Sequence, residues 1–120
     1  MPKEGDLMYG LDKNEDLTFL LNRSLEQVCI GQYDAQMNFH EWANISFMGT
    51  VTIDGHFFES PREAGPLLLK SLGSSIQNVI NPGDGDLTLI FSSGQTVILH
   101  DDDKHYESYN ISAEGRNIIV

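Results

Sequence analysis

The chain has 120 residues, of which 7 are lysine or arginine and 18 are aspartate or glutamate, so its formal charge is −11. This length fits a single domain over residues 1–120, and a hydrophobic content of 40% is enough to build a core. So acidic a chain lacks the basic stripe that nucleic-acid binding needs, and an anionic membrane surface would repel it. The charge either serves solubility alone or attracts a basic protein partner.

The cysteine content and the first residues bear on the compartment. The single cysteine, Cys29, lies in an apolar-rich run, so no internal disulfide can form and we expect a buried, unreactive thiol. Residues 1–10 show no signal-peptide pattern, and the longest apolar run, residues 66–69, is far shorter than a membrane span. We therefore expect a cytoplasmic protein without a cofactor, present as a monomer or a weak homodimer.

The first half of the chain opens with a polar lead-in, residues 1–15, in which residues 7–9 suit a short strand. Asp16 is expected to cap a helical turn that follows it. Apolar and polar residues then predict three strands, at residues 25–30, 33–40 and 45–53. The last of these is long, and we expect it to bend at Gly49.

The second half starts with a helix signal. Ser60 stands before Pro61 in the pattern of a capping box, so a turn of helix is expected there, followed by a short helix over residues 66–72 that ends at Gly73. Loops of turn residues separate the strands that follow, with Ser93–Gly94 as a hairpin turn. These strands are expected at residues 76–80, 87–92, 96–100, 106–111 and 117–120.

The two halves also align with each other. Residues 21–28 lie over residues 72–79 at an offset of 51, and Phe39 lies over Phe91 at an offset of 52. The sequence therefore predicts a mainly β (α+β) fold, an antiparallel β-sandwich or half-barrel with one or two short helices. Two pseudo-repeated three-stranded units, residues 16–55 and 67–111, would pack around a pseudo-twofold axis.

The densest polar cluster is residues 100–107. On an extended segment, Asp101, Asp103, His105 and Glu107 would share one face and could ligate a divalent cation. The spacing matches no defined metal loop, and consecutive aspartates commonly form turns, so we expect a solvated acidic turn and no metal. The four histidines come with no nucleophile elbow and no phosphate-binding loop, so we expect no enzyme.

An aromatic residue joins the acidic ones as a candidate for binding. Trp42 falls at a turn between two predicted strands, where the repeat aligns it with Gly94. An exposed tryptophan ringed by acids suits a protein interface, and covering the edge of the core is the alternative. The residues expected to bind a partner are Asp84, Asp86, Asp101, Asp102, Asp103, Glu107, Glu41 and Trp42.

Three segments resemble the motifs of a family of small uncharacterised bacterial mainly-β proteins with a Tyr-Glu-aromatic signature near the C-terminus: residues 25–33 with Phe39, residues 76–79 with 87–94, and residues 106–111. The likeness spans roughly residues 16–115. It implies the fold and no catalytic residues. Tyr106 and Glu107 match its most distinctive positions.

By type, a small acidic chain without catalytic motifs is also similar to the immunity proteins of contact-dependent inhibition and other polymorphic-toxin systems. Such proteins bind a toxic domain, often a basic nuclease, and block its active site. The likeness implies that this chain neutralises a cognate basic toxin with its acidic loops. Two alternatives stay open: a metal-binding or hydrolytic domain that uses the residues from His100 to Glu107, and a non-catalytic structural β-domain that pairs through an edge strand.

Overall fold

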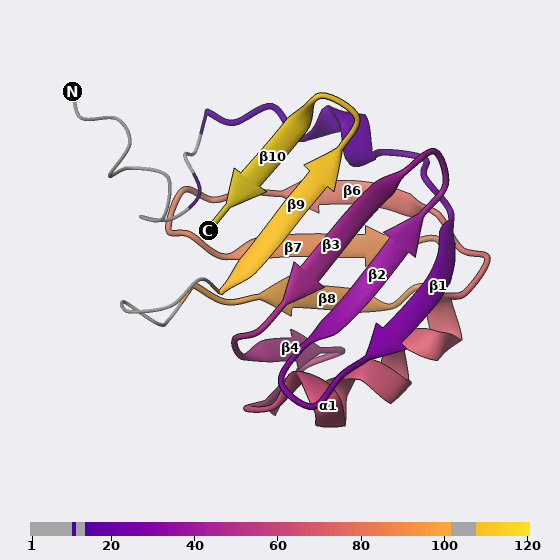
Figure 1. The fold of residues 1–120 in the computed structure, drawn as a ribbon, viewed down its shortest axis with the longest axis vertical. Helices are drawn as coiled ribbons and strands as arrows, with labels where there is room; N and C mark the ends of the chain where they lie inside the picture. Colours follow the sequence, from indigo (N-terminus) through magenta and orange to yellow (C-terminus); the bar gives the residue numbers. More distant parts are fainter. Residues whose placement is uncertain (1–10, 12–13, 102–107) are drawn as a thin grey trace.

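The computed structural model describes residue 11, residues 14–101 and residues 108–120. Its strands form two antiparallel sheets of five strands each, which lie face to face as a β-sandwich (Figure 1). Sheet 1 has the order β1-β2-β3-β9-β10 and sheet 2 the order β5-β4-β8-β7-β6. The predicted fold class, a mainly antiparallel β-sandwich, is confirmed.

The elements have the following bounds. Sheet 1 contains β1 (Leu25–Ile30), β2 (Ala35–Phe39), β3 (Ala43–Phe47), β9 (Tyr109–Ala113) and β10 (Arg116–Ile119). Sheet 2 contains β4 (Val51–Ile53), β5 (His56–Phe58), β6 (Ile76–Ile80), β7 (Leu87–Phe91) and β8 (Thr96–Leu99). The described helices are η2 (Thr18–Leu20), α1 (Pro61–Ala64) and η3 (Gly65–Ser71). The strand expected at residues 7–9 lies outside the described residues.

The core lies between the two sheets. In β2, Ala35, Met37 and Phe39 are buried and alternate with half-buried polar residues, as the period of two predicts. The rings of Phe39 and Phe91 stack with their centroids 6.3 Å apart and 11° between their planes. Burial of each large apolar side chain contributes roughly 1.5–3 kcal/mol, so these inward rows hold the sheets together.

The repeat predicted from the sequence is visible in the hydrogen bonding. Ser24 and Ser75, which are 51 residues apart, form an antiparallel bridge with each other. Both β1 and β6 shift register by one residue at the corresponding place against their neighbour. Two reciprocal backbone bonds, each of 2.8 Å, join equivalent residues across the pseudo-twofold axis: Asn22 N to Ile76 O, and Gly73 N to Leu25 O.

Each half extends beyond three strands and exchanges a hairpin with the other. The β4–β5 hairpin of the first half pairs with β8 of the second, and the β9–β10 hairpin of the second half pairs with β3 of the first. The single long strand expected over residues 45–53 is therefore wrong. The backbone N–H groups of Met48 and Gly49 both donate to Ser108 O, at 2.9 and 3.1 Å, where the chain crosses from sheet 1 to sheet 2. Buried and half-buried residues alternate in the same phase on both sides of this break, because the odd-numbered side chains face the core in both β3 and β4.

The helices lie beside the sandwich rather than between its sheets: α1 and η3 lie near β1, β4 and β5, and η2 contacts β6 (Figure 1). Pro61 occupies the first turn of α1, and Ser60 is its N-cap, but the Ser60 hydroxyl accepts from Arg62 N at 3.2 Å and not from Glu63 N as a capping box predicts. Asp16 likewise accepts the N–H of Thr18 at 3.0 Å ahead of η2. None of the described helices has the length and apolar character that a membrane span requires.

Candidate functional site

Three of the predicted partner-binding residues meet at one side of the sandwich: Asp84, Asp86 and Asp101, here called the acidic edge. Asp84 and Asp86 lie in the β6–β7 loop, and Asp101 follows β8. Asp84 Oδ1 accepts the N–H of Asp86 at 2.9 Å, and Asp86 Oδ1 accepts the N–H of Asp101 at 3.1 Å. These bonds hold two loops, and with them three carboxylates, in one arrangement.

A glycine and a buried tyrosine support the acidic edge from beneath. Gly85 has a φ of +98°, and a Cβ there would lie 2.7 Å from Asp101 Oδ2, so this close approach requires glycine. The buried Tyr109 hydroxyl donates to Gly85 O at 2.6 Å. Burial, followed by the carboxylates of Asp101, Asp86 and Asp84, raises the pKa of Tyr109 far above its usual value.

His100 connects the acidic edge to sheet 2. Its Nδ1 lies 2.9 Å from Asp86 Oδ2, and its Nε2 lies 2.8 Å from Thr52 Oγ1, with the ring of Phe57 tilted against it at 5.9 Å. A hydroxyl, an imidazole and a carboxylate in this order resemble a hydrolytic triad. However, Thr52 lies in β4, which is paired on both sides by β5 and β8, so its neighbouring N–H groups belong to the ladder and not to an oxyanion hole. The arrangement suits a cross-link of three segments better than a nucleophile.

The remaining residues of the predicted acidic cluster lie outside the described residues: Asp102, Asp103, His105 and Glu107. Within the described part of the chain, no group of three or more histidine, cysteine, aspartate or glutamate side chains could hold a metal ion. The metal alternative that used residues 100–107 consequently gains no support from the described residues.

The other two predicted residues, Glu41 and Trp42, lie in the β2–β3 turn. Both have a positive φ, of 64° and 67°, and the Trp42 side chain is 87% exposed. Arg23 holds the turn from behind, because its Nη1 donates to His40 O at 2.8 Å and to Glu41 O at 3.0 Å, and its Nε donates to Phe19 O at 2.7 Å. The tryptophan is thus displayed on a braced turn and does not cover the edge of the core.

Beside Trp42 the outer face of sheet 1 is hollowed into an open groove of about 940 Å³. We call it the amide groove; its polar lining comes from Glu26, Gln27, Asn38, His40, Glu41 and Asn44. Asn44 Nδ2 donates to Asn38 Oδ1 at 2.7 Å, and Asn38 Nδ2 donates in turn to Gln27 Oε1 at 3.0 Å. His40 Nδ1 lies 2.8 Å from Glu26 Oε2.

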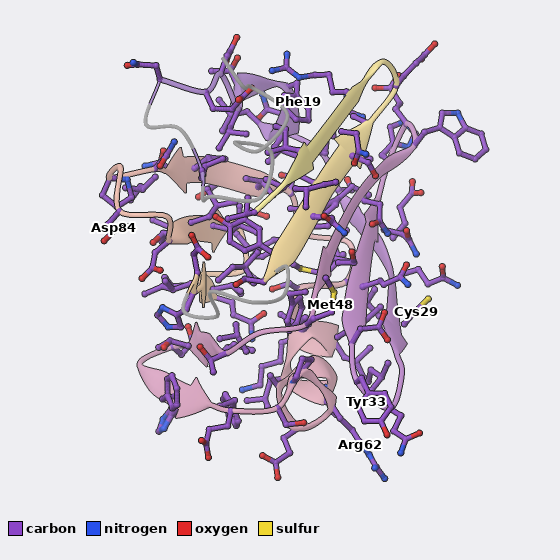
Figure 2. The ribbon with its side chains drawn as sticks, turned by 60° about the vertical axis from the view of Figure 1, so that its left-hand side comes forward. Phe19, Cys29, Tyr33, Met48, Arg62 and Asp84 are labelled. Carbon is purple, nitrogen blue, oxygen red and sulfur yellow. The ribbon has the colours of Figure 1, made fainter. Side chains whose placement is uncertain are left out.

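Sequence reasoning missed the amide groove, although its signal was present in the polar members of the alternating rows. Asn38 and Asn44 are opposite each other in the β2–β3 pair, and each faces outward. Cys29 belongs to this outer surface as well: it is half-buried, with Asn38 Nδ2 3.7 Å from its sulfur, which corrects the expectation of a fully buried thiol (Figure 2).

The structure divides the described partner-binding residues into two groups. The β6–β7 loop, which carries Asp84 and Asp86, lies on the opposite side of the sandwich from the β2–β3 turn, which carries Glu41 and Trp42 (Figure 1). In Figure 2, Asp84 likewise lies across the molecule from Cys29 on the outer face of sheet 1. The acidic edge and the Trp42 turn are therefore two separate surfaces.

Comparison with known proteins adds no assignment: no protein family, curated protein or solved structure matches this chain. The resemblance to a bacterial family and the likeness to immunity proteins therefore stay predictions, and function must be argued from the two surfaces themselves.

Proposed function

We propose that this chain is a non-catalytic protein-binding domain, an immunity-type inhibitor that covers the active site of a basic toxin domain, first of all a nuclease, with its acidic edge. The observation that carries the proposal is the convergence of Asp84, Asp86 and Asp101 from two loops onto one side of the sandwich. A nuclease binds phosphates with cationic side chains, and a fixed set of carboxylates offers the same charge pattern.

The distribution of positive charge supports this use of the acidic edge. The described lysine and arginine residues belong to other parts of the fold, namely the approach to β1, α1, η3 and β10: Arg23, Arg62, Lys70 and Arg116. Arg116 is engaged there, since its Nη2 lies 3.1 Å from Glu15 Oε2 and its guanidinium lies 4.5 Å from the centre of the Phe19 ring. A formal charge of −11 then adds long-range attraction for a cationic partner.

The partner to test is a basic domain encoded by the gene beside this one, as in other toxin–inhibitor pairs. The proposal predicts that co-expression of this chain protects a bacterial host from that domain, and that the two proteins elute as one complex from a sizing column. The variant Asp84→Asn/Asp86→Asn should lose protection, because both changes remove charge and keep an oxygen acceptor for the loop bonds.

The matched control is Glu59→Gln/Glu63→Gln, which removes the same charge from two exposed residues, one just before α1 and one in its first turn. This control should protect the host as well as the wild-type chain does. An absence of any complex with the wild-type chain, or equal protection by both variants, would contradict the proposal.

A further inference from the structure

The amide groove leads to a second inference, which does not depend on the proposed function. We propose that the groove is a binding site for a neutral oligosaccharide, in which one pyranose ring stacks on the indole of Trp42. Three features of the groove point to such a ligand: the conformation of Trp42, the carboxamides beside it and the charge around it.

The conformation of Trp42 has an energetic cost that packing does not repay. A left-handed backbone costs a residue with a side chain roughly 1–2 kcal/mol, and Trp42 adopts a φ of 67°. Its counterpart in the second half, Gly94, is also left-handed, with a φ of 95°, but as a glycine it adopts this conformation without the cost of a side chain. With 87% of its surface exposed, the indole gains little from the core. A large aromatic face presented to solvent in this way is suited to a ligand.

The carboxamides next to Trp42 are already oriented. The bonds from Asn44 to Asn38 and from Asn38 to Gln27 run in one direction across three strands. Among the described residues, this leaves the Gln27 amide nitrogen as a donor and the Asn44 amide oxygen as an acceptor. A ligand would find these groups partly preorganised, with less side-chain entropy to lose on binding.

The chemistry of the groove selects an uncharged, hydroxyl-rich ligand. Glu26 is engaged by His40, and Arg23 by the carbonyl groups of the turn. The Glu41 carboxylate also lines the groove and repels anionic ligands. The overall charge of −11 disfavours phosphorylated or acidic ligands. A sugar ring has an apolar C–H face for the indole and hydroxyl groups at its rim for the amides. The groove of about 940 Å³ is open, as the side of a chain of several sugars requires.

The test uses the full chain, in which Trp42 is the only tryptophan, so intrinsic fluorescence reports on this site alone. The wild-type chain is titrated with cellohexaose, maltohexaose, mannohexaose and chitohexaose, and is then applied to an array of neutral glycans. We expect a saturable change in emission, and protection of the indole from acrylamide quenching, with at least one of these sugars.

Variants locate the site by calorimetry, because Trp42→Ala removes the fluorophore. Trp42→Ala and Asn38→Ala/Asn44→Ala should each weaken binding of that sugar at least about tenfold. The control Tyr33→Ala removes another exposed aromatic ring, 76% exposed in the β1–β2 loop, and should leave affinity unchanged. Binding that survives Trp42→Ala, or no binding to any glycan on the array, would overturn the proposal. A protein partner that shields Trp42 while sugars do not would overturn it in favour of a protein anchor.

Discussion

The β7–β8 and β2–β3 turns occupy equivalent places in the repeat but differ in the residue at their third position. The β7–β8 turn ends in Gly94, and below it the buried Ser71 hydroxyl donates to Gln95 Oε1 at 2.6 Å and lies 2.9 Å from Ser93 Oγ. The β2–β3 turn has the same positive φ at its third residue, but there it carries the exposed Trp42. Glu41 is also left-handed, with a φ of 64°, whereas its counterpart Ser93 is not, so the two halves differ here in backbone as well as in side chains.

The outer faces of the two sheets repeat this contrast. Asn38 and Asn44 of sheet 1 correspond, at an offset of 52, to Ile90 and Thr96 of sheet 2. On the second half Asn78, the counterpart of Gln27, is paired with Ile90, so the row of three amides is not continued there. The inward-facing residues of the two halves must match to form the shared core, whereas their outward-facing residues can differ, because these do not decide the fold.

The largest expected loss of stability comes from the core between the sheets, to which both halves contribute. Phe39→Ala and Phe91→Ala should each lower the free energy of unfolding by about 3–5 kcal/mol, because each leaves a cavity at the stacked pair. Urea denaturation measures both. If one substitution costs less than half as much as the other, the two halves do not share the core equally.

A smaller effect is expected at the serine that supports the second turn. Ser71→Ala should cost about 1–3 kcal/mol, since it leaves the buried Gln95 oxygen without its donor. The equivalent residue of the first half is the apolar Leu20, so no matching bond exists there. Ser93→Ala, at an exposed position, is the control and should cost less; equal costs would show that burial of the network is not decisive.

Exchanging the turn residues tests the strain at Trp42 directly. Gly94→Trp should destabilise the fold by about 1–2 kcal/mol through backbone conformation alone, because a Cβ at Gly94 meets no atom within 4 Å. Trp42→Gly should leave stability unchanged or raise it slightly, since relief of strain offsets the greater chain entropy of glycine. Both are read from urea midpoints. A marked loss of stability in Trp42→Gly would mean that the tryptophan serves the fold.

The smallest expected effect is a fall in the free energy of unfolding at alkaline pH. The pKa of Tyr109 is raised in the folded chain, so its contribution to stability is complete below the unfolded pKa of about 10 and is lost progressively above it, by about 1 kcal/mol near pH 10.5. Urea midpoints measured from about pH 8 upward should fall with this slope in the wild-type chain. Tyr109→Phe should be less stable at neutral pH, since it loses the bond to Gly85 O, but should show a shallower fall. If the wild-type chain and Tyr109→Phe lose stability equally steeply with pH, the fall does not come from Tyr109.

The fold was largely predictable because period-two alternation and turn residues are local signals. Strands β1 and β6 were predicted with the bounds that they have, and the repeat was read from residue offsets. The hairpin exchange was not predictable, since the inward residues of β3 and β4 alternate without interruption and only the contact of Met48 and Gly49 with the distant Ser108 breaks the strand. Likewise, the convergence of Asp86 with Asp101, and the distance of both from Trp42, depend on pairing between strands far apart in the sequence.

The central claim, that the acidic edge binds a basic protein, is tested most directly by the association rate constant with the basic domain encoded beside this gene, measured by stopped flow at increasing ionic strength. We predict an association rate that falls steeply with salt, that drops at least about tenfold at low salt in Asp84→Asn/Asp86→Asn, and that is nearly unchanged in Glu59→Gln/Glu63→Gln. A rate that is insensitive to salt, or that responds equally to both pairs of substitutions, would contradict it.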